Sequence, residues 1–177
     1  MKEVELKLVS ELMKNSRRSD RELARVLGVS QPTVTRMRTR LEKQGYIKEY
    51  TMIPDFPKVG YHLLSLTFVK LRKTLSPEDT EKARECTRRG LREVSFGIVM
   101  VDRGLGFGYD GAILSFHEDY SGYEKYRAWL KHHSFLDLSA IESFLINLDD
   151  VVRYRPLTFA ALAQHLLTLK SNNSTLG

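Results

Sequence analysis

Residues 19–45 read SDRELARVLGVSQPTVTRMRTRLEKQG, and this stretch decides the fold of the first part of the chain. Ser19 followed three residues later by Glu22 is a capping box, which indicates the start of a helix. Gly28 ends that helix, because a glycine adopts the left-handed backbone of a helix end at little cost. A serine and a proline then mark the start of a second helix, which we expect over residues 31–44. Two helices joined by a short glycine turn are typical of a helix-turn-helix.

The second of these helices has two contrasting faces. Val34, Met37 and Leu41 follow the spacing of a buried helical face. The opposite face is built from Thr, Arg, Lys and Gln, which are the side chains that bond base edges and phosphates in the major groove of DNA. The predicted DNA-binding residues are Arg17, Arg18, Ser30, Gln31, Thr33, Thr35, Arg36, Thr39, Arg40, Lys43 and Lys48. Within this set we expect the two arginines at positions 17 and 18 and the two lysines to contact phosphate.

The distribution of charge agrees with a polyanionic partner for this region. The chain has 177 residues and a net charge of +6. Residues 1–50 hold 12 Lys and Arg against 7 Asp and Glu, so they alone carry a net charge of +5. Such asymmetry indicates a nucleic-acid partner, with a solvated basic surface as the simpler alternative.

The segment after the second helix alternates between apolar and polar residues. Over residues 46–53 this pattern predicts a strand, and a strand at this place predicts a winged helix. Arg38 lies at the edge of the buried side of the preceding helix. Its side chain could run along the surface, reach a phosphate or contact a partner subunit.

Residues 19–60 resemble the DNA-binding domain of Lrp/AsnC-type transcription regulators. The resemblance rests on Gly28-Val29-Ser30, Thr33-Val34, Leu41-Glu42 and Gly45 followed by Ile47, and on Tyr50, Asp55 and Gly60. Residues 30–37 also resemble the recognition helix of MarR-type winged helices. The resemblance implies a sequence-specific regulator that binds double-stranded DNA.

The rest of the chain predicts a second domain. Strands are expected over residues 61–71, 94–101, 109–117 and 141–148, with helices over residues 76–91 and 120–133. This order of strand, helix, strand, strand, helix and strand is that of a ferredoxin-like domain. Gly104, Gly106 and Gly108 predict a glycine-rich connection between the second and third strands.

The first strand is apolar on both faces. Leu64, Leu66 and Phe68 point to one side, and Leu63 and Val69 point to the other. Two helices can cover only one face of the sheet, so the other must be buried elsewhere. We expect a second copy of the chain to cover it in a homodimer or higher homo-oligomer, with cover by the C-terminal segment as the alternative.

The same order of elements matches the effector-binding domain of the Lrp/AsnC type. In that family, a hairpin with a Gly-x-Asp pattern lies near an effector cleft. Gly108, Tyr109 and Asp110 match the pattern, so the resemblance implies that they contact a small-molecule effector, an amino acid or another metabolite. The alternative is that Gly108 and Asp110 only turn the chain.

The C-terminal part goes beyond this pattern. Residues 158–169 predict a helix with Phe159, Leu162 and Leu166 on one face, which we interpret as a packing helix. The fold class is therefore α+β: a winged helix-turn-helix, a ferredoxin-like βαββαβ domain and an extra C-terminal helix. The expected domains are residues 1–53 for DNA binding, 54–60 as linker, 61–155 for dimerisation and effector binding, 156–170 as the C-terminal helix, and 171–177 as a disordered tail.

No pattern of residues indicates catalysis, a metal site or a cofactor. The single cysteine excludes an internal disulfide, and the adjacent His132 and His133 point to different sides of a helix. Some proteins of the same architecture are sirohaem decarboxylases, but residues 95–116 lack the His and Trp that these carry. With no signal peptide or span-length apolar run, we expect a cytoplasmic DNA-binding regulator that is not an enzyme and binds no membrane. The alternative within the same class is a constitutive or architectural DNA binder without an effector.

Overall fold

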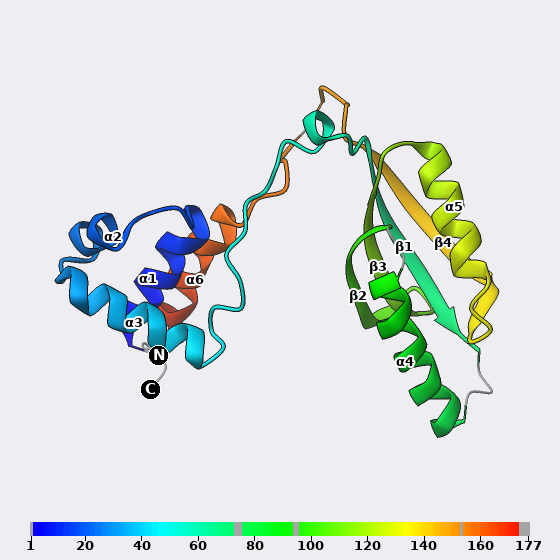
Figure 1. Ribbon diagram of the computed structural model, residues 1–177, viewed down its shortest axis with the longest axis horizontal. Coiled ribbons are helices and arrows are strands. Elements are labelled where there is room, and N and C mark those ends of the chain that lie inside the picture. Colours follow the sequence, from blue (N-terminus) through cyan, green and yellow to red (C-terminus); the bar gives the residue numbers. More distant parts are fainter. Residues whose placement is uncertain (1, 73–75, 94–95, 153, 174–177) are drawn as a thin grey trace. The chain divides into compact units, whose positions relative to one another are not determined.

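The computed structural model describes residues 2–72, 76–93, 96–152 and 154–173. The chain divides into two compact units. The first unit joins Met1–Ile53 with Tyr154–Gly177, and the second spans Pro54–Arg153. The first unit is helical and the second contains the sheet (Figure 1).

Four helices form the first unit: α1 (Glu3–Lys14), α2 (Asp20–Leu27), α3 (Gln31–Lys43) and α6 (Ala160–Asn173). Leu8, Leu23, Val34 and Leu41 are each at most 1% exposed and form the centre of a small apolar core. Burying a side chain of this size stabilises a fold by about 1.5–3 kcal/mol. The core therefore holds α1, α2 and α3 together.

Local sequence signals set the ends of α2, as predicted. The backbone N–H of Glu22 donates to the Ser19 hydroxyl, and the Ser19 N–H donates in turn to the Glu22 carboxylate. At the other end, Gly28 is left-handed, with φ of 67°. An alanine there would meet no neighbouring atom but would have to adopt this strained backbone.

The C-terminal helix α6 packs on α1 through small residues. Ser10 and Ala163 are both fully buried, and the Ser10 hydroxyl donates to the Ala163 carbonyl oxygen at 2.8 Å. The predicted apolar face is wrong in detail, because Phe159 and Leu162 are about half exposed. The expected tail is also wrong in part: residues 171–173 belong to α6, and residues 174–177 lie outside the described chain.

The second unit is a four-stranded sheet with two α-helices. Its strands are β1 (Leu63–Leu71), β2 (Gly97–Gly106), β3 (Tyr109–His117) and β4 (Leu136–Asn147). The order across the sheet is β2-β3-β1-β4, and every pairing is antiparallel. Helices α4 (Pro77–Glu93) and α5 (Tyr120–Lys131) follow β1 and β3, which confirms the ferredoxin-like order.

The hairpin between β2 and β3 is shorter than the three glycines predict. Gly106 pairs with Tyr109 in the sheet, so only Phe107 and Gly108 form the turn. Both have a positive φ, 53° and 81°, as a two-residue turn of this hand requires. The other two glycines belong to β2, because a glycine can be part of a strand as well as of a loop.

The two faces of the sheet differ. On one face, Val69, Ile113 and Ile141 pack against Tyr126 and Leu130 of α5. The opposite face contains the even-numbered residues of β1 and their partners in the sheet. Leu66, for example, lies between Leu114 of β3 and Phe144 of β4.

A buried group of polar side chains lies on the helix-covered face, which the sequence pattern did not indicate. The Ser65 and Thr67 hydroxyls lie 2.8 Å apart. The Ser115 hydroxyl lies 2.9 Å from His117 Nε2. The His117 ring contacts the ring of Tyr126, which is fully buried. Short polar residues at these inward positions leave room for the large aromatic side chains of α5.

Candidate nucleic-acid interface

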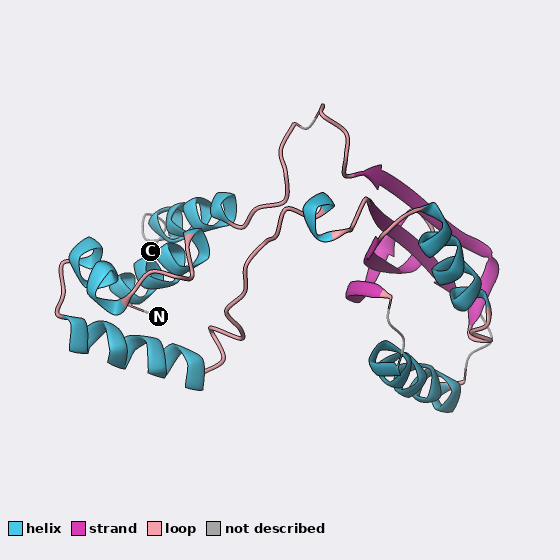
Figure 2. Cartoon of the chain, turned by 45° about the horizontal axis from the view of Figure 1, so that its top comes forward, coloured by secondary structure: helices cyan, strands magenta, loops and turns pink. Residues whose placement is uncertain are grey.

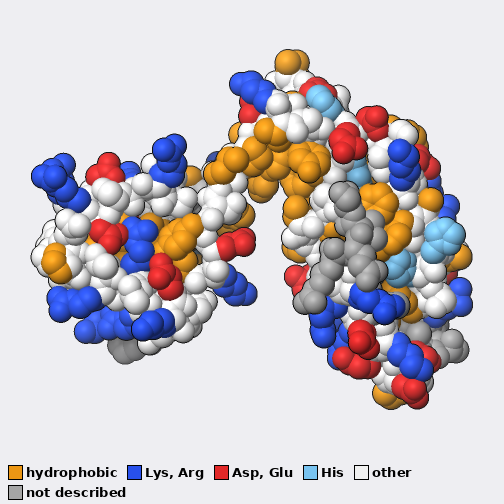
Figure 3. All heavy atoms as spheres, in the orientation of Figure 1, with side chains coloured by type: hydrophobic (Ala, Val, Ile, Leu, Met, Phe, Trp, Pro, Cys, Tyr) orange, Lys and Arg blue, Asp and Glu red, His pale blue; other side chains and the backbone are white. Residues whose placement is uncertain are grey.

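Helix α3 presents the polar face that its sequence predicts. Val34, Met37 and Leu41 are buried against the core of the first unit, so the opposite side of the helix faces solvent. Lys and Arg side chains gather along the edge of the unit that α3 forms (Figures 1 and 3). A shallow depression on this side is lined by Thr35, Arg36, Thr39, Arg40, Lys43 and Gln44. The structure thus brings five of the predicted residues together on one surface.

The other predicted residues lie at the start of α3, in the turn before α2 and in the segment after α3. Ser30 precedes the helix, and its hydroxyl lies 2.8 Å from that of Thr33. Gln31 is the first residue of α3 and is exposed. Arg17 is exposed and Arg18 is half-buried in the turn before α2, while Lys48 is exposed in the segment after α3.

Some of these side chains already have partners within the unit. Arg40 forms an ion pair with Glu5 of α1, a carboxylate that is almost fully buried. Arg18 forms an ion pair with Glu11. The Thr35 hydroxyl donates to Asp20 at 2.6 Å. Arg40 and Thr35 therefore also stabilise the fold.

Two cations on α3 have no such partner. Within the described residues, Arg36 and Lys43 form no ion pair, and both are exposed. The pair Arg36 and Lys43 is separated by two turns of the helix. They are the cations of α3 that are available to a polyanion without breaking an ion pair.

Arg38 binds inside the unit. Its Nη2 atom lies 2.6 Å from Asp20 Oδ1 and donates to the Arg18 carbonyl oxygen at 3.3 Å. The guanidinium also lies 5.6 Å from the centre of the Tyr50 ring. The sequence left three roles open for Arg38: a side chain along the surface, a phosphate contact or a contact with a partner subunit. The ion pair, the hydrogen bond and the cation–π contact of Arg38 all lie within its own unit. Arg38 fixes α3 against the start of α2.

The predicted wing strand is wrong. Residues 47–53 form no strand, and Figure 2 shows the segment after α3 as a loop. A strand needs a partner for its backbone, and none of the described residues of the first unit offers one. Side chains hold this segment instead: Tyr50 donates to Glu42 at 2.7 Å, and Ser16 donates to the Thr51 carbonyl oxygen at 3.1 Å. Partial burial and the bond to Glu42 raise the pKa of Tyr50 to about 12.

The predicted effector residues lie at the hairpin of the second unit. Asp110 accepts a hydrogen bond from the Leu71 backbone N–H at 2.9 Å, which ties the hairpin to the end of β1. The Tyr109 ring contacts Phe68, and the hydrogen bond of its hydroxyl to Glu142 raises its pKa. These contacts account for Tyr109 and Asp110 as parts of the fold, and Gly108 supplies the turn.

Within the described residues, no three His, Cys, Asp or Glu side chains come together as metal ligands do. None of the described helices is both long enough and apolar enough to cross a bilayer.

Comparison with known families places the first unit among DNA-binding domains. Residues 1–48 match a family described as winged helix-turn-helix DNA-binding. An uncharacterized HTH-type transcriptional regulator of Pyrococcus abyssi is 42% identical over 69 residues, which are 39% of this chain and 46% of the relative. The regulator LrpC of Bacillus subtilis is 43% identical over 58 residues, which are 33% of this chain and 40% of the relative. The matches span about half the length of these curated relatives.

Solved structures share the fold of both units. The structure of B. subtilis LrpC has a TM-score of 0.66 at 21% identity, covering 88% of this chain and 99% of that one. A transcriptional regulator of Neisseria meningitidis, solved as an L-Met complex, has a TM-score of 0.74 at 18% identity and covers 94% of this chain and 99% of that one. Escherichia coli AsnC has a TM-score of 0.66 at 16% identity, over 89% of this chain and 97% of that one.

A helix-turn-helix followed by a ferredoxin-like sheet defines a class of two-domain DNA-binding proteins. Within that class, the chain is similar to Lrp/AsnC-type transcription regulators: its residues 1–48 match the winged helix-turn-helix family, and both units share the fold of LrpC and AsnC. The curated relatives named above are described as HTH-type transcriptional regulators.

Proposed function

We propose that the chain is a sequence-specific transcription regulator that binds double-stranded DNA through α3. The observation that carries this proposal is the acid-free outer face of α3, where exposed Arg36 and Lys43 lie in line with Thr39. A solvated helix usually mixes both signs of charge. An uninterrupted run of cations and hydroxyls suits base edges and phosphates.

The residues divide by the contact that each can make. Gln31, Thr33, Arg36 and Thr39 are proposed to contact bases, with Ser30 at the start of the helix. Arg17, Arg18, Lys43 and Lys48 are proposed to contact phosphate. Thr35 and Arg40 remain proposed groove contacts, although each also bonds within the unit. In this proposal residues 1–53 form the DNA-binding domain.

The proposed regulator acts as a homodimer through the open face of its sheet. Phe144 is 65% exposed, and Ile146 and Met100 are 40% exposed on strands β4 and β2. Helices α4 and α5 lie over the opposite face, so a second sheet can cover these side chains. A two-fold dimer also presents two copies of α3, as two half-sites of an operator require. Residues 61–155 would then form the dimerisation domain.

The regulator is further proposed to respond to a small-molecule effector. A structural relative was solved with L-Met, which supports a metabolite ligand of that size here. Gly108, Tyr109 and Asp110 are the proposed contacts at the hairpin. Because Asp110 bonds the Leu71 backbone, a ligand there would act on the junction of two strands.

A duplex-binding experiment tests the proposal. The purified chain is titrated against a labelled duplex from the region upstream of its own gene and against a shuffled duplex of equal composition, at about 50 mM and about 200 mM salt. We expect tighter binding to the upstream duplex that persists at the higher salt, with a footprint of two half-sites. Equal binding that collapses with salt contradicts sequence specificity and favours the architectural alternative.

A further inference from the structure

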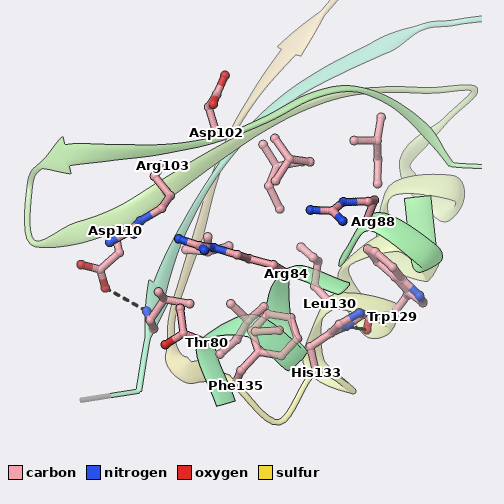
Figure 4. A pocket seen from close by; sticks show the side chains of 18 residues that line it. Thr80, Arg84, Arg88, Asp102, Arg103, Asp110, Trp129, Leu130, His133 and Phe135 are labelled. Carbon is pink, nitrogen blue, oxygen red and sulfur yellow. Dashed lines mark hydrogen bonds between the residues drawn. The ribbon is translucent and has the colours of Figure 1, made fainter. Parts of the chain in front are cut away.

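A cavity of about 430 Å³ lies between α4, α5 and the sheet of the second unit. Its floor and walls are apolar: Val69 and Ile113 come from the sheet, Leu130 and Trp129 from α5, and Phe135 from the loop that follows. Figure 4 shows Trp129, Leu130 and Phe135 around a common space. The volume is that of a pocket for a small organic molecule.

Three arginine side chains bring positive charge to this apolar cavity. Arg84 and Arg88 extend from α4 across the cavity, and Arg103 approaches from β2 (Figure 4). Arg84 forms an ion pair with Glu81 at 3.0 Å, on the exposed surface of α4. Arg88 and Arg103 form no ion pair with any described residue. The cavity thus contains more positive charge than its own acids neutralise.

The two acids of the cavity are placed where they offer little to a ligand. Asp110 already accepts the Leu71 N–H at 2.9 Å, at one end of the cavity. The Asp102 carboxylate points away from the cavity in Figure 4. An ammonium group bound inside would therefore meet the like charge of three arginines, and the Asp110 carboxylate already uses one oxygen on the Leu71 N–H.

We propose that this cavity binds an organic monocarboxylate with an aromatic or branched apolar body and no ammonium group. The carboxylate would be held by Arg88 with Arg84 or Arg103, since a guanidinium can bond both carboxylate oxygens. The apolar body would pack against Trp129 and Leu130. The site lies within one subunit and does not include the turn residues of the hairpin.

The chain contains a direct reporter for such a ligand. Trp129 is the single tryptophan of the sequence, and it lines the cavity. Its ring lies 4.4 Å from the His133 ring and 5.7 Å from the Phe96 ring, so a bound aromatic acid would change its surroundings. Tryptophan fluorescence therefore reports on the surroundings of Trp129 in this cavity.

The test titrates the full chain, without DNA, with 3-phenylpropanoate, L-phenylalanine and 2-phenylethanol. We expect a saturable change in Trp129 fluorescence with 3-phenylpropanoate, and at least about tenfold weaker binding of the other two probes. The double variant Arg84→Met, Arg88→Met should weaken 3-phenylpropanoate binding by at least about tenfold. The matched control Arg127→Met, on α5 but outside the cavity, should stay within about twofold of the unchanged chain.

Several outcomes overturn the proposal. Absence of saturable binding of 3-phenylpropanoate, or equal affinity in the double variant, means that the cavity does not bind carboxylates. Equal affinity for L-phenylalanine overturns the preference for ligands without an ammonium group.

A role of this ligand as an effector rests on the proposed function. Duplex titrations with and without 3-phenylpropanoate separate the test of the cavity site from the test of the regulator function. Saturable fluorescence with no DNA binding under any condition supports the cavity site and contradicts the regulator. DNA binding that the ligand does not alter supports the regulator and contradicts the effector role of this site.

Discussion

Arg38 Nη2 lies 2.6 Å from Asp20 Oδ1, and this contact joins helix α3 to the first residue of α2. Both side chains are about 20% exposed, so most of the pair is shielded from solvent. Asp20 also accepts the Thr35 hydroxyl through its second oxygen. One carboxylate thus fixes two positions of α3, and the orientation of the proposed DNA-binding face depends on it.

Removing either partner should destabilise the first unit. We expect Arg38→Met or Asp20→Asn to lower the free energy of unfolding by about 1–3 kcal/mol, because the remaining charge is left partly buried without its partner. Urea unfolding followed by circular dichroism measures the effect. The exposed Arg25→Met on α2 is the control. If the two changes add in the double variant, the pair does not couple and the assigned role of Arg38 is wrong.

Substitutions of Arg36 and Arg40, on the outer face of α3, should differ in their effects on DNA affinity and on stability. Arg36 has no ion pair within the described residues, so Arg36→Ala should leave the unfolding midpoint unchanged. On the specific duplex it should cost about 1–3 kcal/mol of binding free energy if Arg36 pairs with a base. An equal loss on the shuffled duplex would assign Arg36 to a phosphate.

Arg40→Ala should behave differently. It leaves Glu5, which is 5% exposed, without its guanidinium partner, so the unfolding midpoint should fall as well as DNA affinity. The double change Arg40→Met, Glu5→Met tests the reason, because removing both charges should restore much of the lost stability. Unchanged stability in Arg40→Ala would show that the ion pair contributes nothing to the fold.

His117 should make the second unit sensitive to acid. Burial lowers its pKa from the ordinary value of 6.5, so the folded chain holds the neutral imidazole. Well above pH 6.5 this group is neutral in both the folded and the unfolded chain, and its contribution to stability is constant. Below that value the unfolded chain binds the proton first, and stability falls until the lowered pKa of the folded state is passed.

Urea midpoints measured between about pH 7.5 and about pH 5 check this dependence. His117→Gln should flatten the fall, whereas His132→Gln, at an exposed site, should leave it in place. A His117→Gln chain with the same slope as the unchanged chain would assign the acid sensitivity to other groups.

The sequence predicted correctly those features of the fold that are set by residues close together in the chain. The ends of α2 follow from Ser19, Glu22 and Gly28, which act within one helical turn, and they were predicted correctly. The periodicity of Val34, Met37 and Leu41 likewise predicted which side of α3 is buried. The order of strands and helices followed from similar local patterns.

The errors concern features that depend on distant residues. Residues 46–53 alternate as a strand does, but no neighbouring strand is present among the described residues to pair with them. The ion-pair partners of Arg38 and Arg40 are 18 and 35 positions away in the chain. The sequence alone therefore did not show what either arginine binds. The cavity under α4 was missed for the same reason, because its arginines come from α4 and β2 and its Trp129 comes from α5.

The open sheet face gives the last prediction. Phe144 is 65% exposed on the edge strand β4 of that face, where it neighbours Leu66 of β1. In the proposed dimer its ring is buried against the second sheet. Phe144→Asp would place a charge in an apolar interface, and we expect it to convert a dimer into a monomer at micromolar concentration.

Size-exclusion chromatography with light scattering measures the mass directly. The unchanged chain should have twice the mass of one chain, and Phe144→Asp the mass of one. Val26→Asp, at a 57% exposed apolar residue of the first unit, should remain a dimer. A dimeric Phe144→Asp chain would show that the copies meet elsewhere. Because two half-sites need two linked copies of α3, loss of the dimer should also weaken binding to the specific duplex more than binding to the shuffled one.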